Sequence, residues 1–184
     1  MKRRYKLYAV VAVLLVLAVL IGYRAGNQNF QLNGSKTEEA IASQDETIKR
    51  ETETAVSMLN AINGKIEKGE MTSAKGQKLA ADLLRELRYG KDGQGYFWAD
   101  TTKGVNVVLY GNKDVEGKNR MNDKVNGVEY IKQIIAQGTN GGGFTDYFFP
   151  KKGETEAKAK RAYSVEFKPF GWVIGTGYYL EDVK

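Results

Sequence analysis

The sequence contains no cysteine and no histidine. Without cysteine there is neither a disulfide framework nor a lipoprotein anchor, so packing alone must hold the fold together in any redox compartment. Without histidine the chain lacks the commonest general base, the commonest transition-metal ligand and the usual switch of charge near neutral pH. Nucleophile–base pairs that need either residue are therefore excluded, and we expect neither a metal ion nor a cofactor.

Acidic residues are also missing from the amino-terminal end, where the first one is Glu38. Five of the 28 lysine and arginine residues precede Ala25, and they account for most of the formal charge of +6. From Ala25 onward, 23 basic residues stand against 22 acidic ones. A nucleic-acid surface needs a clustered basic footprint, so we expect no nucleic-acid partner.

One long apolar run is present, at residues 7–23, and it holds 17 residues without a charge. That length is near the minimum for a membrane-spanning helix, and the flanking Lys6 and Arg24 can reach the interface. Four basic residues precede the run, and only Arg24 follows it directly. By the positive-inside rule, residues 1–6 are then cytoplasmic and the rest of the chain lies outside.

A cleaved signal peptide is the alternative interpretation of this run. Its apolar core is shorter, about 7–15 residues, and a small-x-small cleavage site follows it. The segment Gly22–Gly26 fits such a site poorly. We therefore predict an uncleaved transmembrane helix at 7–23, followed by a juxtamembrane segment at 24–35.

Two helices are predicted next, within residues 36–88. Apolar residues from Ile41 to Ile66 recur at spacings of three, four and seven, which is one narrow stripe along a charged helix. Gly69 ends this helix, and Thr72 or Ser73 caps a second one that continues to Leu87.

From residue 91 the pattern changes to short aromatic and β-branched runs broken by glycine and asparagine, which is typical of strands and turns. One helix, at 126–137, interrupts them. We predict an α+β fold whose last three strands form an antiparallel meander, with a polar hairpin loop at 150–159. The predicted strands are Gly95–Asp100, Val105–Tyr110, Phe144–Phe149, Arg161–Phe167 and Trp172–Tyr179.

No sequence motif indicates a catalytic site or a phosphate-binding site. The glycine-rich segment 138–143 lacks the lysine and hydroxyl residue of a phosphate loop and precedes a strand. The turn 92–95 has a single carboxylate where a calcium loop needs several. Asp100 and Asp114 remain open as an acid–base pair, although their spacing does not distinguish them from solvated loop residues.

Aromatic side chains give the stronger signal, because they cluster on several predicted strands. The main groups are Tyr96-Phe97-Trp98, Tyr147-Phe148-Phe149, Phe170-Gly171-Trp172 and Tyr178-Tyr179. About half of these rings must belong to the core. Where loops and a short helix cover one sheet face, tyrosine and tryptophan can instead line a pocket for a small polar ligand.

A family resemblance rests on motifs spread from Leu84 to Asp182. They are Arg88-Tyr89-Gly90-x-Asp92-Gly93, Gly95-Tyr96-Phe97-Trp98, Glu116-Gly117-Lys118-Asn119, Asn126-Gly127, Gly141-Gly142-Gly143-Phe144-x-x-Tyr147-x-Phe149-Pro150, Lys160-x-x-Tyr163, and Phe167-Lys168-Pro169-Phe170-Gly171-Trp172-Val173-Ile174-Gly175-Thr176-Gly177-x-Tyr179. In order and spacing the chain resembles the single Cache domain, in its Cache_2 form, of bacterial transmembrane receptors. Only a two-residue insertion around Gln94 departs from the spacing.

The resemblance implies a PAS-like sensor at 36–184, with helices at 36–88 and sheet and pocket at 91–180, on the periplasmic or outer side of the bacterial inner membrane. Such domains report small organic acids and similar metabolites to chemotaxis receptors, kinases or cyclases. They are typically non-enzymatic and often dimerise through the long helix. We therefore expect a small-molecule ligand, a membrane-bound chain and a homodimer.

Two departures from the family bear on function. Family members often have Met-His-Pro on the second strand, where this chain has Leu109-Tyr110-Gly111. Family members also continue into a second membrane span, whereas this sequence stops at Lys184. It is then either a receptor fragment or a solitary ligand-binding or interaction module that acts through a partner protein.

The predicted pocket uses five side chains: Trp98, Tyr110, Tyr130, Tyr147 and Lys160. Residues 118–123 would form its lid, and Lys160 would meet a ligand carboxylate as a charge-assisted partner. Two alternatives remain open at this stage. Lys160 is equally consistent with a solvated hairpin residue, like Lys151, Lys152 and Lys158. Tyr130, at the edge of an apolar helix stripe, is equally consistent with a core residue.

Two other classes of protein fit less well. A membrane-tethered enzyme needs a catalytic constellation, and the sequence offers none. A pilin-like subunit would carry a glutamate just inside the apolar run and a short leader before it. Residues 7–23 contain no acid, so a sensing domain is the favoured interpretation.

Overall fold

The computed structural model describes residues 36–110 and 112–183. The predicted segments before residue 36, including the membrane helix at 7–23, lie outside this range. Across the described ranges no helix is long and apolar enough to cross a membrane. The chain divides into two compact units between Ile41 and Ala42, and all packing discussed below belongs to the unit Ala42–Val183.

Residues 36–67 are helical and form the long helix. The later elements, in chain order, are α2 (Ser73–Glu86), β1 (Arg88–Tyr89), η1 (Lys91–Gly93), β2 (Gly95–Tyr96), β3 (Trp98–Thr101), β4 (Asn106–Leu109), η2 (Lys113–Val115), α3 (Tyr130–Thr139), β5 (Gly143–Pro150), β6 (Ala157–Phe167), η3 (Lys168–Phe170), β7 (Trp172–Tyr179) and η4 (Leu180–Asp182). This α+β succession confirms the predicted order of two helices, two strands, a helix and three strands.

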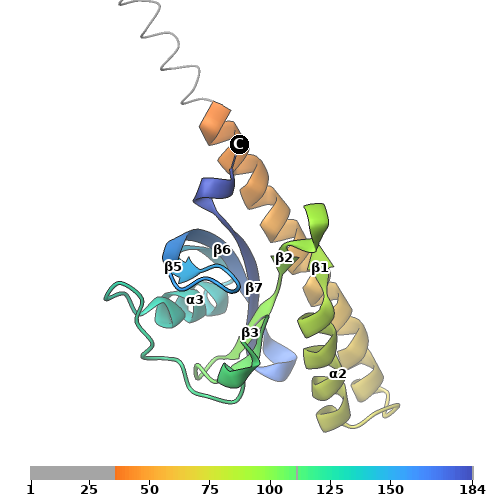
Figure 1. The fold of residues 1–184 in the computed structure, drawn as a ribbon. Coiled ribbons are helices and arrows are strands. Elements are labelled where there is room, and N and C mark those ends of the chain that lie inside the picture. The colour runs from red at the N-terminus through yellow and green to blue at the C-terminus, as the bar shows by residue number, and fades with distance from the viewer. Residues whose placement is uncertain (1–35, 111, 184) are drawn as a thin grey trace, which may run out of the picture. The chain divides into compact units, whose positions relative to one another are not determined.

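A five-stranded antiparallel sheet in the order β4-β3-β7-β6-β5 is the centre of the fold (Figure 1). The predicted meander of the last three strands is confirmed, because β5, β6 and β7 are consecutive neighbours. The hairpin of β3 and β4 joins the free side of β7, with Trp98 opposite Gly175. The sheet therefore brings residues 98–109 beside the carboxyl-terminal strand.

Several boundaries differ from the sequence prediction, and three of the differences exceed one residue. The predicted strand Gly95–Asp100 is divided, because β2 pairs with β1 and only β3 joins the main sheet. The predicted helix at 126–137 begins at Tyr130, because Asn126 and Gly127 have positive φ angles of 50° and 80°. The predicted hairpin loop at 150–159 is shorter, since β5 includes Pro150 and β6 starts at Ala157.

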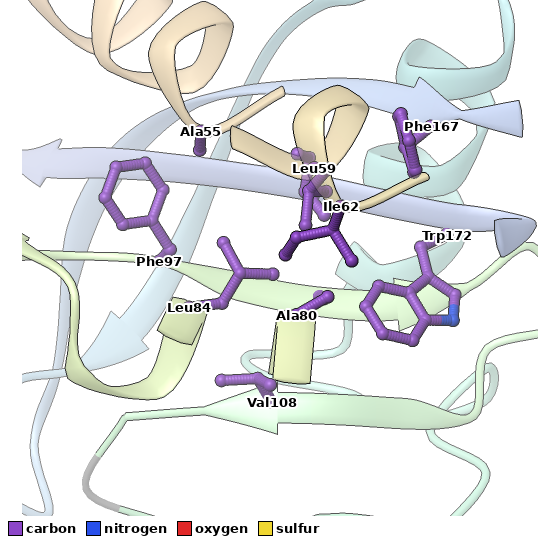
Figure 2. Close-up of a cluster of buried hydrophobic side chains, with 11 residues drawn as sticks. Ala55, Leu59, Ile62, Ala80, Leu84, Phe97, Val108, Phe167 and Trp172 are labelled. Carbon is purple, nitrogen blue, oxygen red and sulfur yellow. The ribbon is translucent and has the colours of Figure 1, made fainter. Parts of the chain in front are cut away.

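The long helix and α2 cover one face of the sheet (Figure 1). Thr72 caps α2 by accepting a hydrogen bond from the Lys75 backbone N–H at 3.3 Å, as predicted. Figure 2 shows side chains from the two helices and the sheet pointing toward one another. This helix-side core contains Ala55, Leu59, Ile62, Ala80, Leu84, Phe97, Ala99, Val108, Phe167, Trp172 and Ile174.

A second core lies on the opposite face of the sheet, under α3. Ile131, Ile134 and Ile135 of α3 pack there against Trp98 and Val173. Gly138 permits this close approach, because a Cβ at that position would lie 2.5 Å from Cγ1 of Val173. The sheet is thus covered by helices on both faces, and strand alternation sends neighbouring residues into different cores.

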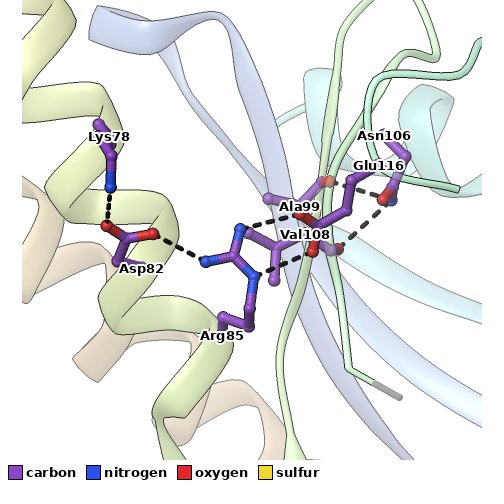
Figure 3. Close-up of polar contacts among 7 residues, drawn as sticks. All are labelled: Lys78, Asp82, Arg85, Ala99, Asn106, Val108 and Glu116. Carbon is purple, nitrogen blue, oxygen red and sulfur yellow. Dashed lines mark hydrogen bonds and ion pairs between the residues drawn. The ribbon is translucent and has the colours of Figure 1, made fainter. Parts of the chain in front are cut away.

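The loop before α3 is tied to both layers. Arg85 of α2 donates two hydrogen bonds to Glu116, Nε to Oε1 at 3.0 Å and Nη2 to Oε2 at 2.9 Å (Figure 3). The backbone of the same loop pairs with the edge beside β4, where the Arg120 N–H donates to the Gly104 carbonyl at 2.7 Å. These contacts fix residues 116–120, which carry Arg120 to the α3 side of the sheet.

The helix-side core makes a direct stability prediction. Leu84 of α2 is fully buried, whereas the neighbouring Leu83 is 39% exposed. We expect Leu84→Ala to lower the free energy of unfolding by about 2–5 kcal/mol, because it leaves a cavity in the core. Leu83→Ala should change it by less than about 1 kcal/mol. Urea unfolding followed by circular dichroism measures both, and equal losses would contradict the packing described here.

Candidate ligand pocket

A cavity lies between the sheet and α3, within the second core. Its volume is about 10 Å³, close to the space that one water molecule requires. The lining combines aromatic, aliphatic and charged side chains. They are Tyr96, Trp98, Asp100, Leu109, Arg120, Tyr130, Ile131, Ile134, Tyr147, Phe149 and Lys160.

Four of the five predicted pocket residues line this cavity, and they are Trp98, Tyr130, Tyr147 and Lys160. Tyr110 does not. It lies one residue beyond the end of β4, and its ring centroid is 5.4 Å from that of Tyr96. Its hydroxyl instead accepts a hydrogen bond from Lys152 Nζ at 2.8 Å, and the guanidinium carbon of Arg88 lies 3.5 Å from its ring centroid.

Lys160 is 1% exposed and lies in β6, so its interpretation as a solvated hairpin residue is wrong. Its Nζ donates a hydrogen bond to the Tyr96 hydroxyl at 2.6 Å. Four rings surround the ammonium, with centroid distances of 4.4 Å for Tyr96, 5.0 Å for Tyr179, 5.3 Å for Trp98 and 5.6 Å for Phe149. Cation–π contacts and one phenol therefore stabilise this buried charge.

The other three lysines of the predicted hairpin have different surroundings. Lys151 pairs with Glu181 and Asp182, Lys158 pairs with Glu156, and Lys152 donates to Tyr110. For Lys160, no carboxylate of the described residues lies within ion-pair distance, and its Nζ contacts only the phenol and the rings. These contacts compensate the buried charge only in part, so an anion would be favoured beside its Nζ.

Tyr96 and Tyr130 carry hydroxyls into the same cavity with opposite electrostatic consequences. Burial acts to raise the pKa of Tyr96, but the charge and hydrogen bond of Lys160 outweigh it, and the pKa is lowered. At Tyr130 burial prevails over the positive charge of Arg120 and raises the pKa to about 12. The Tyr130 phenol therefore stays protonated near neutral pH. The Tyr96 hydroxyl oxygen accepts the hydrogen bond from Lys160.

Arg120 and Asp100 form a second polar group in the lining. Arg120 lies in the predicted lid, and neither residue is among the five predicted pocket side chains. Arg120 is 6% exposed; its Nη2 donates to the Tyr130 hydroxyl and its Nε to Asp123 at 3.2 Å. Asp100 is fully buried and accepts a hydrogen bond at Oδ1 from Asn106 Nδ2 at 2.9 Å. Figure 3 shows Asn106 held by the carbonyls of Ala99 and Val108.

Two polar atoms of the lining residues have no hydrogen-bond partner within the described parts of the chain. They are Trp98 Nε1, a donor, and Asp100 Oδ2, an acceptor. Buried polar groups in folded proteins are nearly always paired, because leaving one unpaired costs about 1–3 kcal/mol. Together with the ammonium of Lys160, which has no carboxylate partner among the described residues, these atoms make the cavity suited to a small polar ligand.

The residues next to Lys160 and its partner Tyr179 in the sheet contact the long helix. Lys160 lies opposite Tyr179 in the sheet, and the next pair is Arg161 opposite Tyr178. Asp45 of the long helix accepts hydrogen bonds from Arg161 Nε at 2.8 Å and from the Tyr178 hydroxyl at 2.9 Å. Of these two adjacent residue pairs of β6 and β7, one carries the pocket lysine on one face of the sheet, and the other contacts the long helix on the opposite face.

Comparisons with known proteins agree with this architecture. The sequence profile of the family described as Single Cache domain 2 matches residues 40–184. The methyl-accepting chemotaxis protein McpP of Pseudomonas putida is 27% identical over 180 residues, which cover 97% of this chain and 31% of the relative. The sensor histidine kinase MctS of Rhizobium johnstonii is 31% identical over 195 residues, covering 100% of this chain and 40% of the relative.

Solved structures give the same result. A periplasmic sensor domain of a chemotaxis protein superposes with a TM-score of 0.72 at 27% identity, covering 76% of this chain and 96% of that one. A Cache chemosensory domain studied for carboxylic acid recognition also has a TM-score of 0.72, at 28% identity and coverages of 77% and 97%. The family profile spans most of the sequence, and the chain belongs to the single Cache domain 2 family.

Proposed function

We propose that this chain is the extracytoplasmic sensing domain of a bacterial membrane receptor and that its ligand is a small organic acid. One observation carries the proposal, namely the buried ammonium of Lys160 that faces the cavity without a carboxylate partner among the described residues. A ligand carboxylate would pair with Lys160 and could accept from the unpartnered Trp98 Nε1. The net positive lining therefore favours an anion over a cation or a neutral amine.

The relatives support this proposal from two directions. One structural neighbour is described as a Cache domain that recognises carboxylic acids, and another as a periplasmic sensor domain. The predicted membrane helix at 7–23 would place residues 36–184 in the same compartment. The chain spans 31% and 40% of the lengths of its two curated relatives. Chemotaxis signalling or kinase activity would therefore be an output that lies outside the Cache domain.

Ligand entry requires the pocket walls to move. The cavity has room for about one water molecule, so even a two-carbon acid needs a displacement of the lining. The loop 118–123, predicted as the lid, is held to the sheet edge through Arg120 and its neighbours. A ligand shifts the balance between a closed and an expanded arrangement only by its differential affinity for the two.

The pair Arg161 and Tyr178, next to Lys160 in the sheet, provides a route by which ligand binding can affect the long helix. A carboxylate that binds Lys160 contacts β6 at the residue before Arg161. Arg161 and Tyr178 hold Asp45 by hydrogen bonds. We propose that ligand binding alters this contact and thereby the position of the long helix against the sheet.

The ligand proposal predicts a specific effect of Lys160→Met. Calorimetry with short carboxylates, amino acids and amines should detect carboxylate binding to the full chain in a mild detergent. The variant should lose roughly 10- to 100-fold in affinity, because one charge-assisted contact is removed. Its unliganded form should be as stable as the original or more so, because a buried unpaired charge is replaced by an apolar chain.

Lys158→Met is the matched control, since Lys158 lies on the same strand but pairs with Glu156. It should leave carboxylate affinity unchanged. Failure of every carboxylate to bind the original chain would contradict the proposed function, as would equal affinities for the original chain and Lys160→Met.

The coupling proposal predicts a different result for Asp45→Asn. Ligand affinity should remain within about threefold of the original, because Asp45 does not line the cavity. Ligand-induced protection from hydrogen exchange in residues 42–67 should be largely lost. Asp146→Asn is the control, since Asp146 also binds Arg161, at 2.7 Å, but lies on β5. Undiminished protection in Asp45→Asn would exclude this route.

A further inference from the structure

The cavity contains a buried carboxyl group, that of Asp100, which carboxylate binding at Lys160 does not use. Asp100 lies on the same face of β3 as Trp98, is fully buried and lines the cavity. Its Oδ2 has no hydrogen-bond partner among the described residues. A buried carboxyl oxygen without a partner needs a reason, because leaving such a group unpaired is costly.

The surroundings of Asp100 satisfy one oxygen of its carboxyl group and leave Oδ2 without a partner among the described residues. Asn106 Nδ2 donates to Oδ1, and Asn106 is itself fixed by the carbonyls of Ala99 and Val108. Burial raises the pKa of Asp100, while the hydrogen bond from Asn106 and the positive charge of Arg120 act in the opposite direction. A donor on the ligand would give Oδ2 the hydrogen bond that the protein does not supply.

The charges of the lining decide what kind of donor fits. Lys160 and Arg120 bring two positive charges to the lining, and Arg120 is paired with Asp123 at 3.2 Å. A ligand carboxylate would pair with the remaining positive charge, which is that of Lys160. An ammonium group near Asp100 would also meet the charge of Arg120, whereas a hydroxyl group adds a donor without adding a charge.

We propose that Asp100 is a specificity-determining residue that accepts a hydrogen bond from a ligand hydroxyl, so that the preferred ligand is a short hydroxy monocarboxylate. The inference rests on the proposed function, since it assumes that the carboxylate of the same ligand pairs with Lys160. An unsubstituted acid leaves Oδ2 unpaired. A keto acid presents an oxygen that only accepts, and two acceptors face each other.

The expected preference for hydroxy acids follows from the cost of leaving Asp100 Oδ2 without a hydrogen bond. Sites built to hydrogen-bond a ligand hydroxyl reject analogues that lack it, because the buried partner is then left unsatisfied. We expect glycolate to bind about tenfold or more tightly than acetate. One enantiomer of lactate should bind more tightly than propionate and pyruvate by a similar factor, which is the effect of one hydrogen bond to a charged group.

Asp100→Asn tests the assignment with little change in shape. The carbonyl oxygen of the new amide can still accept from Asn106, while the amide NH₂ replaces the acceptor Oδ2 by a donor. Calorimetry on the full chain in detergent should show the lactate-to-pyruvate preference fall to about threefold or less, because the keto oxygen can now accept. Asp114→Asn, in an exposed position of η2, should leave that preference unchanged.

The outcomes separate this inference from the proposed function. Acetate and propionate binding with no hydroxy-acid advantage would overturn the role of Asp100 and leave carboxylate sensing intact. Retained selectivity in an Asp100→Asn variant that still binds acetate would also overturn it. If none of these acids binds the original chain, both proposals fail.

Discussion

The ammonium of Lys160 is the constraint on which the rest of the site depends. It is buried on β6, it touches the Tyr96 phenol and four aromatic rings, and no described carboxylate pairs with it. A protein interior tolerates such a charge only with compensation. The aromatic cage provides part of that compensation, and a carboxylate ligand would provide the remainder at the moment of binding.

The sheet also places this charge close to the contact between the strands and the long helix. Because side chains alternate along a strand, Lys160 and Arg161 reach opposite faces of β6. Tyr179 and Tyr178 do the same on β7, directly opposite in register. The pocket and Asp45 of the long helix are therefore separated by one sheet thickness. This arrangement lets a small ligand act on a helix that it does not touch.

Much of the fold follows from the sequence pattern. Strand alternation places Tyr96 and Trp98 on one face and Phe97 on the other, and the two cores have this composition. The Thr72 cap and the buried stripe of the long helix were also predictable from spacing. These features are local, or depend on period alone, so a single sequence is sufficient to identify them.

The site was predictable only in part, because its remaining features depend on tertiary contacts. Lys160 lies in a strand because β5 and β6 pair as far as Pro150 and Ala157. The polar composition of the hairpin does not indicate where this pairing ends. Arg120 reaches the cavity because backbone pairing of its loop with Gly104 fixes its position. Asp100 continues the alternation of Tyr96 and Trp98, so that signal was present in the sequence. Tyr110 was misplaced because β4 ends at Leu109.

A high-resolution crystal structure of the chain with bound glycolate tests the central claim most directly. The carboxylate should lie within hydrogen-bond distance of Lys160 Nζ and Trp98 Nε1, in the cavity between the sheet and α3. A ligand bound elsewhere, or one whose carboxylate contacts neither atom, would contradict the assignment of Lys160 as the anchor of the ligand.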